Sequence, residues 1–162
     1  VWHNGGADVT FTNCMFTGTL TANVEDVDLT DNTITGAAYS ATGDGRLIID
    51  GVMYSNKMIQ DASDENLYYI STPAALFDFA GKVNTGETFN GKTIKLTADI
   101  NLANKDWTPI GTSGYPFMGT FDGQEKTISN LKVSVTDGPA GLFGLINSPA
   151  IIEKVEEAPV AE

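Results

Sequence analysis

The sequence feature that most constrains the fold is an internal repeat in the first third of the chain. The segment VTFTNCMFTG, which begins at Val9, aligns with VDLTDNTITG, which begins at Val27. A looser copy, LIIDGVMYSN, begins at Leu47, so that the copies start 18 and then 20 residues apart. The equivalent positions carry large apolar residues, namely Val9, Val27 and Leu47, then Phe11, Leu29 and Ile49, then Phe16, Ile34 and Tyr54.

Each copy alternates apolar and polar residues and is interrupted at Asn, Asp or Gly, which is typical of a strand, a bend and a second strand. A unit of about 20 residues cannot bury its apolar face alone, but stacked units can do so at about 4.8 Å per layer. The sequence therefore predicts an all-β fold, a right-handed parallel β-helix or solenoid. The residues expected in its core include Val9, Phe11, Val27, Leu29, Leu47 and Ile49.

The pattern changes between Asn56 and Asn90. Ser71 and Thr72 place hydroxyl caps before Pro73, a residue suited to the first turn of a helix. Apolar residues then follow at helical spacing, and Gly86 is a suitable end. We predict one short α-helix over about 73–83, which is inserted into the β-helix or caps one of its ends. The apolar positions in this helix are Leu76, Phe79, Ala80 and Val83.

Apolar alternation returns after Asn90, as in GKTIKLTADINL, and glycines punctuate the rest of the chain. The domain prediction is accordingly β-helix coils over residues 1–57, a connector with the short helix over 58–90, and further coils over 91–162 that continue the same domain.

The charge excludes several classes of partner. The chain carries 21 acidic and 9 basic residues, a net charge of −12, and its one arginine is Arg46. Nucleic acid and anionic membrane surfaces are therefore excluded as partners. No apolar run approaches the roughly 18 to 20 residues of a membrane span. The chain begins at Val1 without a signal peptide, which predicts a mature or excised fragment.

Few residues are suited to catalysis. With one cysteine, Cys14, and one histidine, His3, the chain lacks the residues for Cys–His catalysis or a Cys/His zinc site. Arg46 stands alone beside Asp44 in a loop sequence. Aspartates and a glutamate cluster at Asp26, Asp28 and Asp31 and at Asp61, Asp64 and Glu65, where we expect solvated faces. On stacked coils Asp28 or Asp31 could approach Asp50, so an acidic groove formed by these residues is an alternative. We predict no catalytic residue, no metal site and no cofactor, apart from a weak Ca²⁺ ion in the Asp-rich loops.

Three aromatic residues, Trp107, Tyr115 and Phe117, surround the loop sequence TSGYPF. An exposed aromatic ring on a loop can stack on the apolar face of a sugar. These three residues are the predicted ligand-binding residues, with Tyr115 the best single candidate. The alternative is that the rings pack over the edge of a coil.

Three further motifs occur in order: WTPIG (107–111), GTFDGQEKTISNL (119–131) and AGLFG (140–144). With these motifs the chain resembles the GLUG-motif family of pectin-lyase-like, β-helical surface proteins, over roughly residues 68–147. The motif residues have structural explanations: Gly119 and Gly123 allow tight backbone turns, and Asp122 suits an Asx turn. The resemblance implies a bacterial protein that is secreted or on the cell surface, with an adhesin-like role and no reaction.

We therefore predict a non-catalytic structural or adhesive module, extracellular or on the cell surface. Its expected partner is a glycan or a host or bacterial surface protein. Two alternatives remain open. The first is a fragment of a carbohydrate-active β-helix enzyme, either a polysaccharide lyase or a glycoside hydrolase. The second is a spike or fibre segment that works as a trimer through exposed strand edges.

Overall fold

The computed structural model describes the backbone of six short strands between residues 9 and 41, and residues 46–49, 52–134 and 138–157. Side chains are described in the last three ranges, up to Glu156. The chain divides into two compact units, residues 1–57 and 58–162, which are taken here one at a time.

The described residues of the first unit form short strands in three sheets. A four-stranded sheet has the order β1-β4-β7-β8, and two pairs of strands form the parallel sheets β2-β5 and β3-β6. The strands are β1 (Val9–Thr10), β2 (Met15–Thr17), β3 (Leu20–Ala22), β4 (Asp26–Asp28), β5 (Thr33–Thr35), β6 (Tyr39–Ala41), β7 (Arg46–Ile49) and β8 (Val52–Ser55).

The alignment of the repeats is confirmed by the strand register. Val9 pairs with Val27, and Val27 pairs with Leu47, in parallel strands. Leu47 and Ile49 are buried, as predicted. Phe11 and Leu29 lie outside the described residues, as do the side chains of Val9 and Val27.

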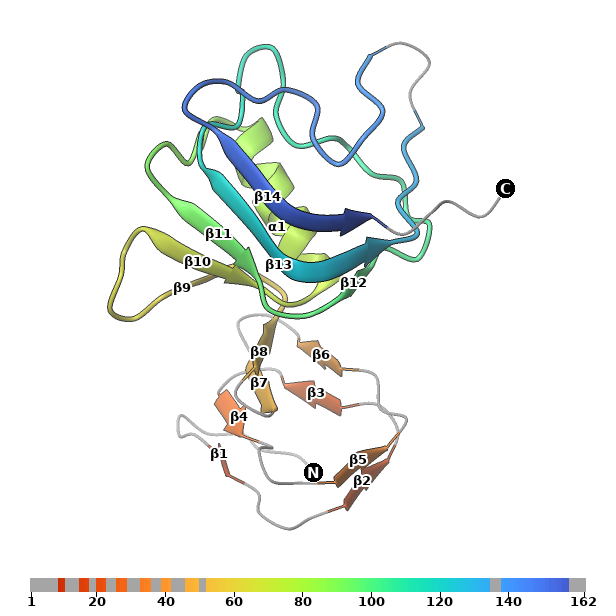
Figure 1. Ribbon diagram of the computed structural model, residues 1–162. Helices are drawn as coiled ribbons and strands as arrows, with labels where there is room; N and C mark the ends of the chain where they lie inside the picture. The colour runs from red at the N-terminus through yellow and green to blue at the C-terminus, as the bar shows by residue number, and fades with distance from the viewer. Residues whose placement is uncertain are drawn as a thin grey trace. The chain divides into compact units, whose positions relative to one another are not determined.

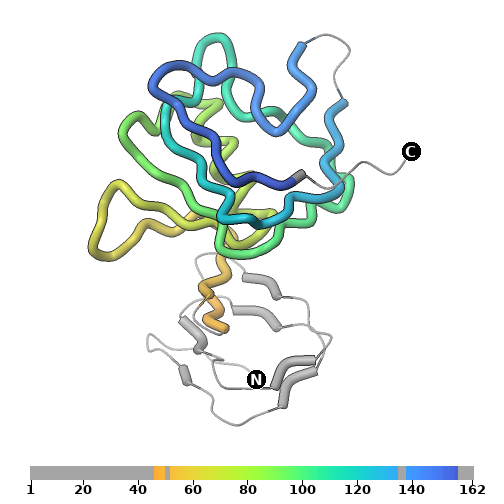
Figure 2. Tube along the Cα trace, viewed as in Figure 1, coloured from red at the N-terminus to blue at the C-terminus, as the bar shows by residue number. Residues whose placement is uncertain are grey.

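The second unit is one mixed sheet with a helix on one face (Figure 1). The strand β13 pairs with β11 and β12 along one edge and with β14 along the other, and β10 and β9 follow beyond β11. Figure 2 shows β10, β11, β13 and β14 side by side along the Cα trace. The elements are β9 (Ile59–Gln60), β10 (Leu67–Ile70), α1 (Pro73–Asn84), β11 (Thr93–Leu96), β12 (Ile100–Asn101), β13 (Thr120–Ser129) and β14 (Ile151–Glu157).

The predicted helix is confirmed. It begins at Pro73, and the hydroxyl of Thr72 caps it by accepting a hydrogen bond from the N–H of Ala75 at 3.1 Å. It ends at Asn84, and Gly86 follows with φ +123°, a backbone angle that favours glycine. The apolar face of α1 covers the sheet, because its four predicted apolar residues are all buried there.

An aromatic cluster lies at the centre of this core. The ring of Phe79 on α1 lies 5.9 Å from that of Phe121 on β13 and 5.6 Å from that of Phe117. The ring of Phe143 lies 5.5 Å from Phe117 and 5.3 Å from Phe121. These contacts join α1, β13 and the two loops around β13 into one core.

The predicted parallel β-helix is wrong. Both units contain mixed sheets, since β7 and β8 are antiparallel, as are β9 and β10, and the described residues form no solenoid. In the third repeat, Leu47 pairs with Tyr54 of the same repeat rather than continuing into a further parallel layer. In the sequence, Asp50 and Gly51 lie between these two apolar runs, and Asp-Gly at such a place favours a tight antiparallel hairpin over a further parallel layer.

Candidate functional site

Trp107 lies in the core of the second unit, not on a surface. Its side chain is almost completely buried, and its ring centroid lies 5.0 Å from that of Phe77 on α1. The indole Nε1–H donates a hydrogen bond of 3.1 Å to the carbonyl oxygen of Leu142. A sugar therefore cannot stack on Trp107 in this arrangement, and the indole instead fastens the loop that contains Leu142.

Phe117 is also buried, within the aromatic cluster between Phe79 and Phe143. Its backbone N–H donates a hydrogen bond of 3.0 Å to the carbonyl oxygen of Leu145. The structure therefore does not bring the three predicted ligand-binding rings onto one surface. Trp107 and Phe117 are instead buried in the core of the second unit.

Tyr115 is different, because 46% of its surface is exposed. It closes a tight turn: the N–H of Thr112 donates to the carbonyl oxygen of Tyr115 at 3.0 Å, and the N–H of Tyr115 donates back at 3.1 Å. The hydroxyl Oγ1 of Thr112 also accepts from the N–H of Tyr115, at 3.2 Å. The two residues in between, Ser113 and Gly114, are exposed. The turn therefore fixes the main chain on which the exposed ring stands.

The end of α1 holds this turn in place. The side chain of Asn84 accepts a hydrogen bond of 2.8 Å from the N–H of Gly111 and donates one of 3.1 Å to the carbonyl oxygen of Pro109. The ring of Tyr115 lies over Gly86, where an added Cβ would come within 3.5 Å of its Cε1. Sequence reasoning did not identify Asn84, because nothing local distinguishes it from any other polar residue at a helix end.

We call this surface the Tyr115 site, made of the 112–115 turn, Asn84 and Gly86. It offers one exposed aromatic face and one phenol hydroxyl on a backbone held by five hydrogen bonds. Such a group can stack on an apolar C–H face and exchange a hydrogen bond.

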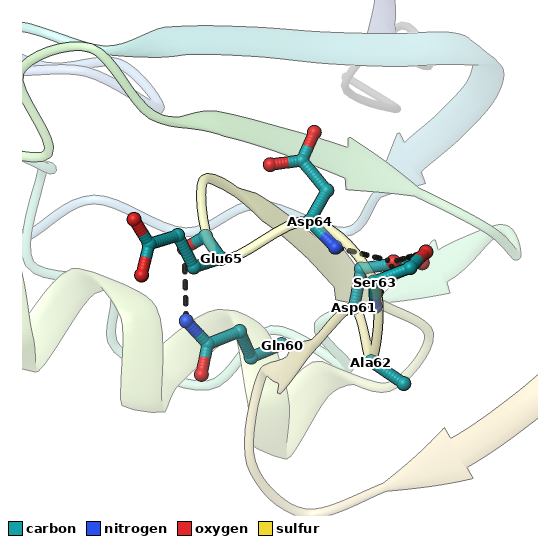
Figure 3. A pocket seen from close by; sticks show the side chains of 6 residues that line it. All are labelled: Gln60, Asp61, Ala62, Ser63, Asp64 and Glu65. Atoms are coloured by element: carbon teal, nitrogen blue, oxygen red, sulfur yellow. Dashed lines mark hydrogen bonds between the residues drawn. The ribbon is translucent and has the colours of Figure 1, made fainter.

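A second surface feature is the acidic loop that follows β9 (Figure 3). Its residues line an open hollow of about 570 Å³, and the residues of this lining are Gln60, Asp61, Ala62, Ser63, Asp64 and Glu65. The side chain of Gln60 donates a hydrogen bond of 2.8 Å to the carbonyl oxygen of Glu65, which closes the loop from one side. The loop is thus shaped by its own polar contacts.

Asp61 organises this loop. Its Oδ1 accepts hydrogen bonds from the N–H of Ser63 at 2.9 Å and of Asp64 at 3.0 Å, and its Oδ2 accepts from the hydroxyl of Tyr69 at 2.9 Å. The hydrogen bonds from Ser63 contribute most to lowering the pKa of Asp61 to about 2. Both carboxylate oxygens are therefore already occupied by protein donors. Among the described residues no group of three or more His, Cys, Asp or Glu side chains is arranged to hold a metal ion.

The remaining predicted positions have separate locations. In the strand register of the first unit Arg46 lies opposite Asp26, and Asp28 lies opposite Ile48. Asp31, Asp44 and Asp50, together with His3 and Cys14, lie outside the described residues. The acidic groove near Asp50 therefore stays a prediction.

The predicted Asx turn at Asp122 is confirmed. Its Oδ1 accepts a hydrogen bond of 3.0 Å from the N–H of Gln124, two residues on. Gln124 and Glu125 both have positive φ, and the pairing of β13 with β14 shifts register between Asp122 and Lys126. Asp122 therefore makes the bend that lets one long strand pair with three others.

Among the residues described, no helix combines the length and the apolar character that crossing a membrane requires.

Comparison with known proteins adds one relative. No family model matches the chain, and no solved structure matches it. A protein of Evansella cellulosilytica named "Putative Gly-rich membrane protein" is 30% identical over 97 residues. That match covers 59% of this chain but 11% of the relative, so the chain spans about a tenth of the relative's length.

Proposed function

We propose that this chain is a non-catalytic adhesive module of a secreted or cell-surface protein, and that it contacts a glycan through Tyr115. The observation that carries the proposal is an aromatic residue, Tyr115, which is 46% exposed and stands on a turn that hydrogen bonds hold. A preformed aromatic contact loses little conformational entropy on binding, which is why tyrosine is common in binding surfaces.

Two further facts support a surface location. The printed name of the relative contains the words membrane protein, and the WTPIG, GTFDG and GLFG motifs resemble those of bacterial surface proteins. The net charge of −12 favours a neutral or cationic partner over a polyanion.

The test is a glycan-array screen of the full 162-residue chain beside two variants. Tyr115→Ala removes the ring, and we expect it to weaken binding by about tenfold or more, as for other central aromatic contacts. Tyr115→Phe is the matched control, because it keeps the ring and loses only the hydroxyl. It should bind within about threefold of the parent.

Two results would contradict the proposal: no binding to any glycan, or equal binding by the parent and Tyr115→Ala. The enzyme and trimer alternatives stay predictions with their own measurements. Turnover of acidic polysaccharides that Asp28→Asn abolishes would favour the enzyme, and a stable trimer in light scattering would favour the spike or fibre segment.

A further inference from the structure

The last described part of the second unit, residues 138–157, differs from the rest by its exposed apolar side chains. We call it the outer segment. It contains four of the five large apolar residues that are exposed in the described chain: Leu145, Ile146, Ile151 and Ile152. No residue from 138 to 152 is charged. The outer segment therefore presents an apolar surface beside a strand.

Within the part of the chain that the structure describes, that strand, β14, has a partner along one edge. Within the described residues β14 pairs with β13 and with no other strand. The N–H of Ile151 donates to the carbonyl oxygen of Gly119 at 3.0 Å, so this residue's backbone groups face β13. Because backbone groups alternate along a strand, those of Ile152 face away from β13. An edge of this kind can pair with a further strand.

The charges on β14 indicate which charges a strand that pairs with it would carry. Lys154 lies 3.7 Å from the carboxylate of the buried Asp122, so its charge is balanced within the fold. Glu153 and Glu156 are exposed, and neither forms an ion pair with another described residue. The chain as a whole carries a net charge of −12, so a second copy would bring like charge to this edge.

We propose that the free edge of β14 binds an extended cationic segment of a partner protein, which adds to the sheet as a further strand. Because successive side chains of a strand point to opposite faces, apolar side chains on one face of that segment would cover Ile152, and lysines or arginines on its other face would pair with Glu153 and Glu156. Backbone hydrogen bonds to Ile152 would supply the register. The proposal goes beyond glycan binding, since it uses none of the residues of the Tyr115 site.

The test measures binding of the full chain to a short fluorescent peptide in which valine alternates with lysine. A peptide in which valine alternates with glutamate is the matched probe of opposite charge. We expect the lysine peptide to bind in low salt, more weakly as salt rises, and the glutamate peptide not to bind.

Two variants separate pairing from simple charge attraction. Ile152→Pro removes an N–H that faces away from β13, which an edge strand tolerates, and should weaken peptide binding by about tenfold or more. Ile152→Ala shortens the same side chain but keeps the N–H and should weaken it less. The double variant Glu153→Gln, Glu156→Gln carries no proline and should reduce binding by about fivefold.

Each remaining outcome overturns the proposal. No binding of the lysine peptide would do so directly. Equal binding by the parent and a folded Ile152→Pro variant would show charge attraction without strand pairing, and unchanged binding by the double glutamine variant would remove the charge argument. Concentration-dependent self-association that Ile152→Pro abolishes would make a second copy of the chain the occupant.

Discussion

The interior strands and the outer segment of the second unit contain the same kinds of residue in the same register, yet their burial differs. Ile94 on β11 pairs with Phe121 on β13, and both are fully buried, but Ile152, which pairs with Phe121 from the other side, is 36% exposed. Likewise Phe117 is fully buried and its partner Ile146 is 47% exposed.

The difference teaches that the burial of an apolar residue in this sheet depends on whether chain segments lie on both sides of it. Among the described residues, an interior residue has a neighbouring strand or loop on each side, while a residue of the outer segment has one on one side. The apolar pattern of the sequence is the same in the interior strands and in the outer segment. It therefore does not mark which described strand lies at the edge of the sheet. The outer segment therefore has the apolar composition of the interior strands, but its large apolar side chains are exposed.

The largest effect on stability is expected from truncating Phe121, the interior residue of the Phe121–Ile152 pair. Phe121→Ala should lower the free energy of unfolding by about 3 to 5 kcal/mol, because it leaves a cavity beside Phe79 and Phe143. Ile152→Ala should lower it by less than about 1 kcal/mol, since solvent already reaches that side chain. Urea unfolding curves measure both. Equal losses of unfolding free energy in the two variants would contradict the distinction between the interior strands and the outer segment.

A smaller effect is expected where the interior touches the outer segment. Gly111 has φ +88°, and a Cβ there would lie 2.0 Å from the carbonyl oxygen of Leu145. Gly111→Ala should therefore destabilise the protein by about 2 to 4 kcal/mol and loosen the outer segment. Gly114→Ala is the matched control, because it meets nothing within 4 Å and should change stability by less than about 0.5 kcal/mol.

Hydrogen exchange of the outer segment distinguishes a local from a global effect in Gly111→Ala. Faster exchange in residues 138–157 with little change in β11 is the expected result. An unchanged exchange pattern and an unchanged urea midpoint would show that the backbone at Gly111 is not in close contact with the outer segment.

The smallest effect concerns the ionised side chain at the joint of β13 and β14. Burial raises the pKa of Asp122, but the hydrogen bonds from Gln124 and the nearby charges of Lys154 and Lys95 outweigh it, so the pKa lies below its usual value of 3.8. A lowered folded pKa means that the stabilisation is complete above the unfolded value. It is then lost as the pH falls through the folded value.

At neutral pH we expect Asp122→Asn to cost about 1 to 2 kcal/mol, the worth of hydrogen bonds to a charged group. The difference in Tm between the parent and this variant should shrink as the pH falls below about 3.8. Thermal melts at a series of pH values measure it. A difference that grows in acid would give the shift the opposite sign.

Part of the candidate site could be predicted from sequence. Tyr115 beside Gly114 and Pro116 is an aromatic residue in a turn sequence, and it is exposed. The burial of Trp107 and Phe117 could not be predicted, because their partners lie far away in the chain. Trp107 bonds to Leu142, and Phe117 packs on Phe79 and Phe143. No pattern within the TSGYPF region separates these rings from Tyr115.

The sequence by itself determined local features: the register of the repeats, the helix that begins at Pro73 with Thr72 as its cap, and the Asx turn at Asp122. Each depends on residues adjacent in the chain or on a regular spacing, and short-range sterics and hydrogen bonding fix such features. Only the tertiary structure decided the direction in which β9 pairs, and which apolar residues are covered. Apolar alternation is the same in parallel and antiparallel strands, and burial depends on what packs from elsewhere in the chain.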